Sequence, residues 1–273
     1  MFNALNKISY KTYLLNNPFF LDIGISRAEV ESLTEKELRT KIKKGVYDSV
    51  IPNVTNPKIA ELDDLIRLHF LVTSRKITTI LEFGLGVSTK VLDHAIQSNK
   101  QKFSNYVSEN LRRSNAFEVH SVDNSKIWIK RNKKKYNLAC TSIHFSKCYM
   151  GKFNDRICTY YSKLPNISPD FIYLDGPDQH TVSGDIHGIS TRNIDRLPMA
   201  ADLLAIEHFL LPGTLVVIDG RTANARFLQS NLQRNWKCQY IKEFDQHFFE
   251  LDEAPLGKIN GLQMKFSKSS SYF

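Results

Sequence analysis

The stretch ILEFGLGVSTKVL, residues 80–92, combines the three local signals that decide the fold. An apolar run ends at Glu82, two glycines follow at Gly84 and Gly86, and a helical pattern begins at Ser88. The glycines allow a tight turn and a close approach of ligand atoms, because no Cβ intervenes. A strand, a glycine-rich turn and a helix in this order predict a nucleotide-binding unit with a helix N-terminus beside the ligand.

Apolar runs and helical patterns alternate over more than 150 residues around this stretch. The expected strands are ITTILEF (77–83), FEVHSVD (117–123), LACTSIHF (138–145), DFIYLDG (170–176) and GTLVVIDG (213–220). The helical patterns between or after them are STKVLDHAIQS, the basic segment 125–135, IDRLPMAADLLAIEHFLL (194–211) and TANARFLQSNLQRN (222–235). This alternation predicts an α/β, Rossmann-like, doubly wound and mainly parallel sheet. The later stretches CQYIKEF and GLQMKF are expected to add antiparallel strands at one edge.

The first 55 residues precede this alternation and carry helical stretches of their own. SRAEVESLTEKELRTKIKKG begins with a capping residue at Ser26 and ends at Gly45, and the loop IPNVTNP follows. KIAELDDLIRLHFLVTSRK (58–76) then shows apolar residues at helical spacing. We therefore expect a helical N-terminal extension over 1–55, serving as an acceptor lid or an oligomer contact, and a Rossmann-like domain over 56–273.

Composition bounds the class of protein. The chain has 273 residues, 42% of them hydrophobic and 24% charged, which is typical of a globular protein with a sizeable core. No apolar run approaches the roughly 20 residues that cross a bilayer, and the N-terminus does not resemble a signal peptide. The four cysteines form no CxxC pair, so a disulfide framework or zinc site is not expected and a reducing cytoplasm fits.

The net charge of +9 raises the question of an anionic partner. Much of the excess lies in KIWIKRNKKKY (126–136), which has no acidic residue. Such a run is most often a solvated helix face, and otherwise attracts an acidic substrate, RNA or a membrane surface. No aromatic-interleaved RNA-binding motif accompanies it, so a nucleic-acid partner is possible but not favoured.

Four of the expected strands end on an acid: Glu82, Asp123, Asp175 and Asp219. Ligands of an open parallel sheet bind outside the carboxyl ends of its strands, so these acids are expected to converge on one crevice. A single acid at a strand end often only begins a loop or caps a helix. Four of them, one beside a glycine turn, favour a ligand site.

The pattern around the glycines disfavours two familiar nucleotides. A dinucleotide fingerprint requires a third glycine where this chain has Thr89, and an acid about twenty residues further on. The phosphate-binding loop of nucleoside triphosphatases requires GKS or GKT, which is absent. Four acids around a pyrophosphate would also repel it.

The motifs together resemble the class I S-adenosylmethionine-dependent methyltransferases over roughly residues 58–266. The similarity lies in ExGxGxS(T) on the first strand, an acid ending the second, YLDGPD ending the fourth, and LLPGTLVVIDGR on the fifth. The chain departs from the family pattern at Ser88, where a third glycine is usual, and in the late position of Asp123.

This resemblance implies S-adenosylmethionine (SAM) as the cofactor. It places Glu82 beside the glycine loop near the amino-acid portion of SAM, and Asp123 at the ribose hydroxyls. Gly84, Gly86 and the helix start at Ser88 and Thr89 complete the expected cofactor site. Carboxylates suit SAM chemically, because they accept hydrogen bonds from hydroxyls and attract its sulfonium and ammonium groups.

The segment YLDGPDQHTVSGDIHG (173–188) is the richest in reactive side chains. Two interpretations stay open for it. His180 is a general base that Asp175 orients, or else Asp175 and Asp219 with a nearby His or Asp bind a divalent cation, as in the catechol-type members of the family. Asp175, His180 and Asp219 are therefore the expected catalytic residues. The alternative to a catalytic role is that this segment is a solvated surface loop.

DGRTANARF (219–227) supplies two candidate substrate ligands. Arg221 and Arg226 could hold an anionic group, since a guanidinium binds carboxylate or phosphate bidentately. The leading functional prediction is a SAM-dependent methyltransferase for a small polar or anionic acceptor, favouring O-methylation of a sugar or cell-surface building block. The alternatives are an RNA methyltransferase and a Rossmann-like binding module without activity.

Overall fold

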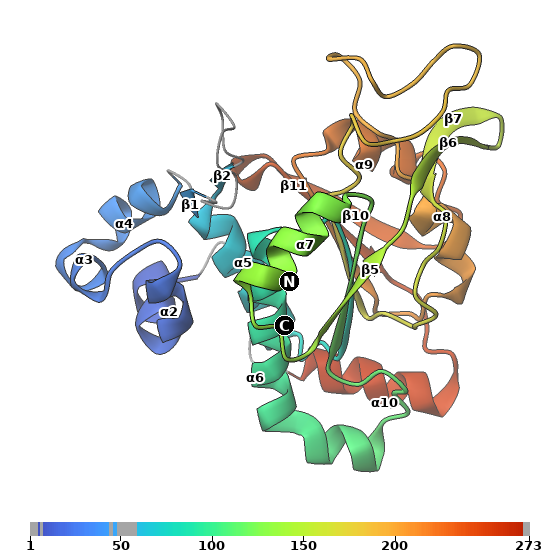
Figure 1. Ribbon diagram of the computed structural model, residues 1–273. Coiled ribbons are helices and arrows are strands. Elements are labelled where there is room, and N and C mark those ends of the chain that lie inside the picture. The colour runs from blue at the N-terminus through green and yellow to red at the C-terminus, as the bar shows by residue number, and fades with distance from the viewer. Residues whose placement is uncertain (1–4, 6–7, 44–45, 48–58, 270–273) are drawn as a thin grey trace.

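The computed structural model describes residues 5, 8–43, 46–47 and 59–269, and the core of this part is a seven-stranded sheet (Figure 1). Its strand order is β10-β11-β9-β8-β3-β4-β5. Five strands are parallel, whereas β11 is antiparallel to both of its neighbours. Their bounds are β3 Thr79–Phe83, β4 Glu118–Asp123, β5 Thr141–Phe145, β8 Phe171–Leu174, β9 Leu215–Asp219, β10 Trp236–Ile241 and β11 Gln246–Leu251.

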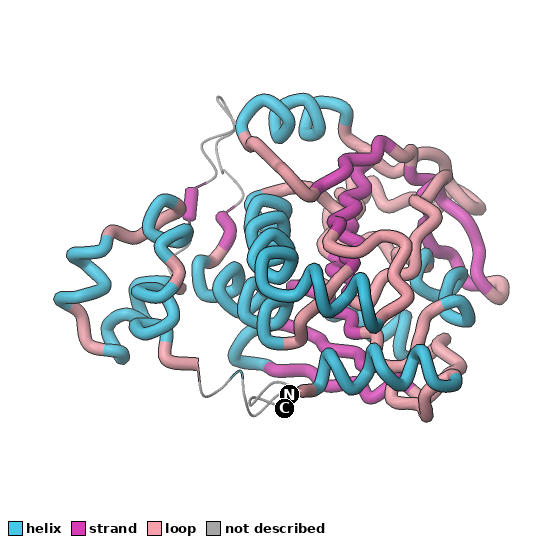
Figure 2. Tube along the Cα trace, turned by 90° about the horizontal axis from the view of Figure 1, so that it is seen from below, coloured by secondary structure: helices cyan, strands magenta, loops and turns pink. Residues whose placement is uncertain are grey.

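Helices cover both faces of this sheet (Figure 2). Successive strand residues point to opposite faces, and Ile80 and Leu81 accordingly belong to two different buried clusters. One face packs against α5, α6, α10 and the N-terminal helices, and the other against α8 and α9. The bounds are α5 Leu62–Ser74, α6 Val87–Asn110, α7 Lys126–Lys135, α8 Asp202–Ile206, α9 Thr222–Gln229 and α10 Gly257–Lys268, with short 3-10 turns η2 Glu207–Phe209 and η3 Lys242–Phe244. The doubly wound α/β fold is thus confirmed.

The strand expected at GLQMKF is not formed, for an identifiable reason. GLQMKF is helical, within α10, because Leu262 and Phe266 lie one turn apart and both pack on the core, so the relevant period is 3.6. The second strand on this side of the sheet is β11, which lies between β9 and the edge strand β10. The polar sequence 98–116 is largely the continuation of α6 to Asn110, which is why Asp123 lies late along the chain.

A β-hairpin that the sequence did not indicate projects beside the sheet. It consists of β6 (Cys148–Phe153) and β7 (Arg156–Tyr161), which pair antiparallel with each other. The loop after β8 bonds to it through a bridge between Tyr149 and Ser183. The four cysteines are unpaired, Cys148 and Cys158 being buried within this hairpin.

The described part of the N-terminal extension is helical, as expected. It contains α2 (Tyr10–Asn16), η1 (Pro18–Asp22), α3 (Arg27–Ser32) and α4 (Glu35–Ile42). The segment beginning at Ser26 forms two helices rather than one, since a second capping box at Thr34 and Glu37 starts a new helix. The predicted boundary at 55/56, the loop IPNVTNP and Gly45 lie outside the described residues.

These N-terminal helices pack beside α5 (Figure 1). Their buried side chains share one hydrophobic cluster with α5 and α6, and the Tyr13 hydroxyl lies 2.7 Å from Nδ1 of His69. A short pair of strands, β1 (Val46–Tyr47) and β2 (Ile59–Ala60), joins the extension to α5. The extension therefore stands next to the helix that leads into β3.

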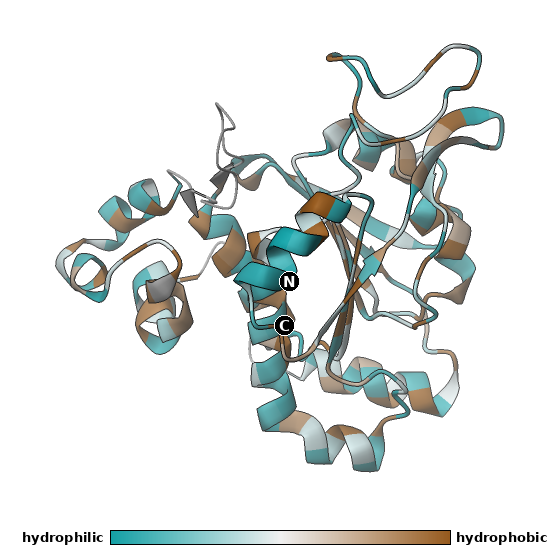
Figure 3. Cartoon of the chain, viewed as in Figure 1, coloured by the Kyte–Doolittle hydropathy of each residue, from teal (hydrophilic) through white to brown (hydrophobic). Residues whose placement is uncertain are grey.

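None of the described helices is long and apolar enough to span a membrane. The basic segment forms α7, which is almost uniformly hydrophilic beyond its first turn (Figure 3). Five of its lysines are exposed: Lys126, Lys130, Lys133, Lys134 and Lys135. The lysines of its last turn oppose the negative end of the helix dipole, consistent with a solvated helix face.

Candidate active site

A cleft of about 900 Å³ opens at the carboxyl ends of β3, β4, β8 and β9. The connection from β3 to β4 runs through α6 on one face, and the connection from β8 to β9 runs through α8 on the other. The adjacent strands β3 and β8 therefore flank a topological switch point. Ligands of doubly wound sheets bind in the crevice that such a reversal creates. The predicted location of the site is therefore formed by the fold itself.

The turns after β3 and β8 touch each other through their backbones. Gly84 has φ +97°, and a Cβ on it would lie 3.1 Å from the carbonyl carbon of Asp175. A Cβ on Gly176 would lie 2.8 Å from the amide nitrogen of Gly84 and 2.8 Å from the Tyr161 hydroxyl. Both glycines are thus required by the protein's own packing.

Gly86 has a different environment. It lines the cleft, and a Cβ on it would meet only the Ser88 hydroxyl, at 3.9 Å. Its lack of a side chain leaves room in the cleft rather than relieving contact with the protein. Both glycines of the motif line the cleft, and Gly86 is the one at which a side chain would enter open space rather than collide with the protein.

Glu82 lies behind the glycine turn and does not line the cleft. It is fully buried, and its carboxylate accepts hydrogen bonds from Ser88 (2.7 Å), Thr89 (2.8 Å) and Ser121 (2.5 Å). The Thr89 hydroxyl in turn accepts from the amide of Gly86 at 3.2 Å. Glu82 and Thr89, expected as direct cofactor ligands, are therefore placed as residues that hold the turn, whereas Ser88 also lines the cleft.

Substituting Glu82 by glutamine should flatten the pH dependence of stability. Burial raises the pKa of Glu82 to about 7 from 4.5, despite the three hydroxyl donors. Because the pKa of Glu82 is higher in the folded than in the unfolded protein, the protonated carboxyl group favours the folded state. Its contribution to the free energy of unfolding, up to about 3 kcal/mol, is complete below about pH 4.5 and is lost as the pH rises through 7. Urea unfolding between pH 5 and 8 should show a smaller loss for Glu82→Gln than for the wild type; equal slopes would contradict this origin.

Asp123 ends β4 and does line the cleft. Its two carboxylate oxygens accept from the backbone amides of Leu85 (3.0 Å) and Ser125 (2.6 Å). It is 6% exposed and so ties the glycine turn to the start of α7. Trp128, on the first turn of α7, forms a neighbouring wall of the cleft.

Acidic side chains dominate the lining. Lys43, Lys242 and Arg221 are its basic residues. Its carboxylates number eight: Glu61, Asp64, Asp123, Asp175, Asp178, Asp219, Glu243 and Asp245. The cleft is therefore negative in a chain whose net charge is +9, and such a potential attracts cationic ligands and repels anions.

Asp219 sits at the end of β9 with two donors on its carboxylate. Tyr173 donates from its hydroxyl at 2.8 Å and Gln246 from its amide at 3.2 Å. Burial raises the pKa of Asp219, and burial also raises the pKa of Tyr173 well above its ordinary value. Tyr173 is thus a fixed donor that orients Asp219 toward the cleft.

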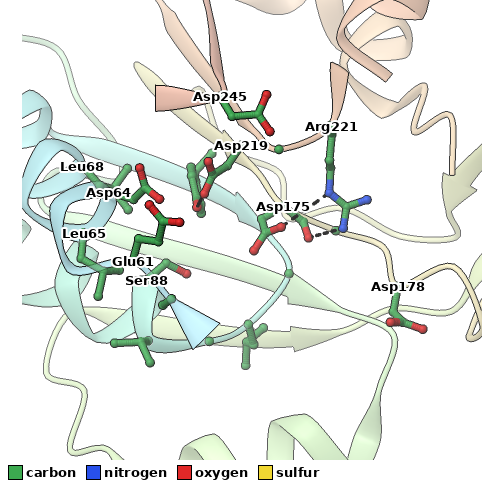
Figure 4. A pocket seen from close by; sticks show the side chains of 18 of the residues that line it. Glu61, Asp64, Leu65, Leu68, Ser88, Asp175, Asp178, Asp219, Arg221 and Asp245 are labelled. Carbon is green, nitrogen blue, oxygen red and sulfur yellow. Dashed lines mark hydrogen bonds and ion pairs between the residues drawn. The ribbon is translucent and has the colours of Figure 1, made fainter. Parts of the chain in front are cut away.

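Arg221 does line the cleft, but its guanidinium is directed at the protein (Figure 4). It donates to the carbonyl oxygens of Pro177 (3.1 Å) and Asp175, and its Nε lies 3.5 Å from the Asp175 carboxylate. It thereby clamps the loop after β8. Arg226, the other expected substrate ligand, is exposed and lies outside the cleft lining.

The predicted pair of His180 and Asp175 is not assembled. His180 is exposed and does not line the cleft, and Arg221 is the partner that Asp175 meets instead. The geometry therefore does not support His180 as a general base that Asp175 orients. The loop's contribution to the cleft consists of Asp175, Gly176, Asp178 and Thr181.

The predicted metal ligands Asp175 and Asp219 do not form a group of three close ligand atoms. In the part of the chain that the structure describes, such a group is formed by Glu61, Asp63 and Asp64, whose oxygens lie within 4.8 Å of one another. Arg67 already pairs with Asp63, at 2.7 Å, and with Asp64. A guanidinium between two of the three carboxylates opposes a divalent cation there.

Several cleft residues were not predicted from the sequence. Glu61 and Asp64 come from the start of α5, and Lys242–Asp245 from the turn between β10 and β11. The only local signal was the pair Asp63-Asp64 in a first helical turn, which ordinarily reports a favourable helix dipole. Their position at the cleft depends on how α5 and the edge hairpin pack beside β9.

The fold and site together define a Rossmann-like protein with an acid-lined cleft at its switch point and a glycine turn closed from behind by a buried glutamate. No family model and no curated protein matches the sequence. Among solved structures, the SAH-bound methyltransferase PaMTH1 of Podospora anserina is similar at 12% identity and TM-score 0.42, over 80% of this chain and 95% of its own.

Two further solved structures show the same degree of similarity. The O-methyltransferase TomG of Streptomyces achromogenes, in complex with SAM, shares 12% identity at TM-score 0.36, over 72% of this chain and 82% of its own. An O-methyltransferase of Bacillus cereus in complex with SAH shares 11% identity at TM-score 0.38, over 89% and 99%. At these values the similarities assign neither a family nor an activity, so the functional argument rests on the site.

Proposed function

We propose that this chain is a SAM-dependent methyltransferase acting on a small polar acceptor. The observation that carries the proposal is the carboxylate-lined cleft beside the open backbone of Gly86 at the switch point. SAM carries a sulfonium, an ammonium, one carboxylate and a ribose diol, so its net charge is positive, and it has no phosphate. Carboxylates attract the two cationic groups and accept hydrogen bonds from the diol.

The same lining argues against a dinucleotide. A pyrophosphate beside Gly86 would share the cleft with Asp123 and Asp175, and the guanidinium that lines the cleft, Arg221, is held by the loop after β8. Repulsion between these charges in a half-enclosed cleft is large compared with that in water. A nucleoside that carries an ammonium group and no phosphate therefore suits this cleft better than a dinucleotide does.

The cofactor would occupy the part of the cleft formed by β3, β4 and the start of α7. Gly86 and the backbone of the turn would lie against it, Asp123 beside its hydroxyls, and Trp128 along one wall. When bound, SAM supplies the electrophilic methyl group. This chain's own contribution is to orient the acceptor at the β8–β9 end, where proximity alone supplies much of the rate enhancement of such a transfer.

The residues that line the cleft also restrict the charge of the acceptor. The sequence suggested a polar or anionic molecule, but Arg226 lies outside the cleft and Arg221 is already paired, so an anionic group finds no free guanidinium there. RNA is disfavoured on the same ground, because phosphates entering the cleft meet its carboxylates.

O-methylation of a sugar or cell-surface building block rests on sequence reasoning alone. A binding module without activity is the outcome if cofactor binds without turnover.

The cofactor can be tested directly by calorimetry with SAM, SAH, NADH and ATP. We expect the two adenosyl ligands to bind and the two phosphate-bearing ones not to. Asp123→Asn should weaken SAM and SAH at least about tenfold, because an amide nitrogen would face the backbone N–H of Leu85 or Ser125.

Glu109→Gln is the matched control, since Glu109 is an exposed acid at the far end of α6 and its loss should leave both affinities unchanged. Circular dichroism would show that each variant is folded. Absence of SAM and SAH binding by the folded wild-type protein would contradict the proposed function.

A further inference from the structure

The end of the cleft farthest from Asp123 is formed by acids from three separate elements. We name Glu61, Asp64, Asp219 and Asp245 the acid end. Glu61 and Asp64 belong to the start of α5, Asp219 to the end of β9, and Asp245 to the turn between β10 and β11. Their carboxylates gather around one side of the pocket (Figure 4).

The basic side chains near the acid end offset only part of its charge. Lys43 and Lys242 line the same cleft. Arg67, 1% exposed, pairs with Asp64 and with the buried Asp63, and its guanidinium lies 4.0 Å from the Phe244 ring centroid. Glu61 and Asp245 have no basic partner among the ion pairs of the described residues. The acid end therefore keeps negative charge for a ligand to neutralise.

A second, smaller cavity adjoins the acid end, and a buried carboxylate oxygen in its lining has no hydrogen-bond donor. Its volume is about 250 Å³, and it shares Lys43, Glu243 and Phe244 with the main cleft. Asp63 lines it, is 2% exposed, and has an Oδ1 atom without a hydrogen-bond partner in the described part of the chain. A buried carboxylate oxygen left unpaired is costly, so this cavity is suited to a ligand that donates hydrogen bonds.

The walls favour an organic cation over a metal ion. Leu65, Leu68, Tyr173 and Phe244 line the same end of the cleft and offer apolar surface to an alkyl chain. Arg67 already holds one oxygen each of Asp63 and Asp64, so the most closely spaced carboxylates are partly neutralised and offer less charge to a divalent cation. An ammonium group has three donors, and the remaining carboxylates can each accept one of them.

We propose that the acid end binds the ammonium group of an amine-bearing acceptor, with Glu61, Asp219 and Asp245 around the charge and Asp63 accepting from a donor that reaches the smaller cavity. The substrate class is thus a small aliphatic amine rather than an anion or a neutral sugar. That this amine is the methyl acceptor rests on the proposed function, whereas its binding at the acid end does not.

Calorimetry with three matched five-carbon probes tests the site: the diamine cadaverine, the neutral diol pentanediol and the dicarboxylate glutarate. Each is titrated into the full chain, with and without saturating SAH. We expect cadaverine to bind at least about tenfold more tightly than the other two in either state. The double variant Glu61→Gln/Asp245→Asn should weaken cadaverine at least about tenfold and leave SAH affinity unchanged. Asparagine tolerates the left-handed backbone of Asp245, at φ +48°, so this variant is expected to fold.

Glu109→Gln removes one negative charge outside the cleft and should not change cadaverine binding. Equal affinity for diol and diamine, preference for glutarate, absence of cadaverine binding, or tighter binding of Mg²⁺ or Ca²⁺ alone at this end would each overturn the amine proposal. SAH titration reports on the proposed function separately. Binding of SAH without cadaverine would support the proposed function and contradict the amine site. Binding of cadaverine without SAH would support the amine site and contradict the proposed function.

Discussion

Replacing Gly176 by alanine is expected to lower the free energy of unfolding by about 2–4 kcal/mol. The new methyl carbon would lie 2.8 Å from the backbone nitrogen of Gly84 and 2.8 Å from the hydroxyl of Tyr161. Neither atom has room to retreat, since Gly84 is tied to Val122 by a 2.9 Å hydrogen bond and the Tyr161 ring stacks on Phe83. Urea denaturation followed by circular dichroism measures the change.

Gly86→Ala separates this structural role from ligand binding. Its methyl group meets only the Ser88 hydroxyl at 3.9 Å and lies at the cleft, so stability should change by less than about 1 kcal/mol. The same methyl group should lower the affinity for SAM and SAH at least about tenfold, because it occupies the space left for the ligand. Wild-type stability of Gly176→Ala would show that the two turns separate freely, and undiminished binding by Gly86→Ala would place the cofactor elsewhere.

Arg67→Met is expected to destabilise the protein by about 3–5 kcal/mol. Arg67 is buried, and it pairs with Asp63 and Asp64 and donates to the Tyr10 hydroxyl at 3.2 Å. Its loss leaves the buried Asp63 carboxylate without a cation, and it removes a direct link between the N-terminal extension and α5. Thermal and urea unfolding would measure the loss of stability, and limited proteolysis would report release of the extension.

A surface arginine gives the matched control for this prediction. Arg27 pairs with Glu31 one helical turn away, and both side chains are more than half exposed, so Arg27→Met should cost less than about 1 kcal/mol. Adding Asp63→Asn to Arg67→Met should recover part of the stability, because the uncompensated buried charge is removed. An effect of Arg67→Met no larger than that of Arg27→Met would contradict the buried network.

Several features followed from local sequence. The apolar runs ending at Glu82, Asp123 and Asp219 became β3, β4 and β9, because short apolar segments between helical patterns bury well only as central strands. The glycine turn lies where the motif placed it. Asp123, Asp175 and Asp219 line one cleft, because the carboxyl ends of parallel strands share one edge of the sheet.

The roles of individual side chains did not follow in the same way. Glu82 carries the signature of a ligand-binding acid, yet burial behind the turn and three hydroxyl donors make it a support for that turn. Arg221 holds a loop, and His180 is exposed and does not line the cleft. Sequence position fixes which strand end a residue occupies, but not whether its side chain turns toward the ligand or toward a neighbouring backbone.

The sequence by itself determined the doubly wound sheet, the glycine turn and the strand-end acids, because periodicity and turn chemistry act within a few residues. Only the tertiary structure decided the other half of the cleft. Glu61 and Asp64 are separated from Asp245 by about 180 positions of chain, and they meet because α5 packs on one face of the sheet while β11 inserts beside β9. Such long-range packing leaves no local pattern, so the charge of the acid end emerges only once the chain has folded.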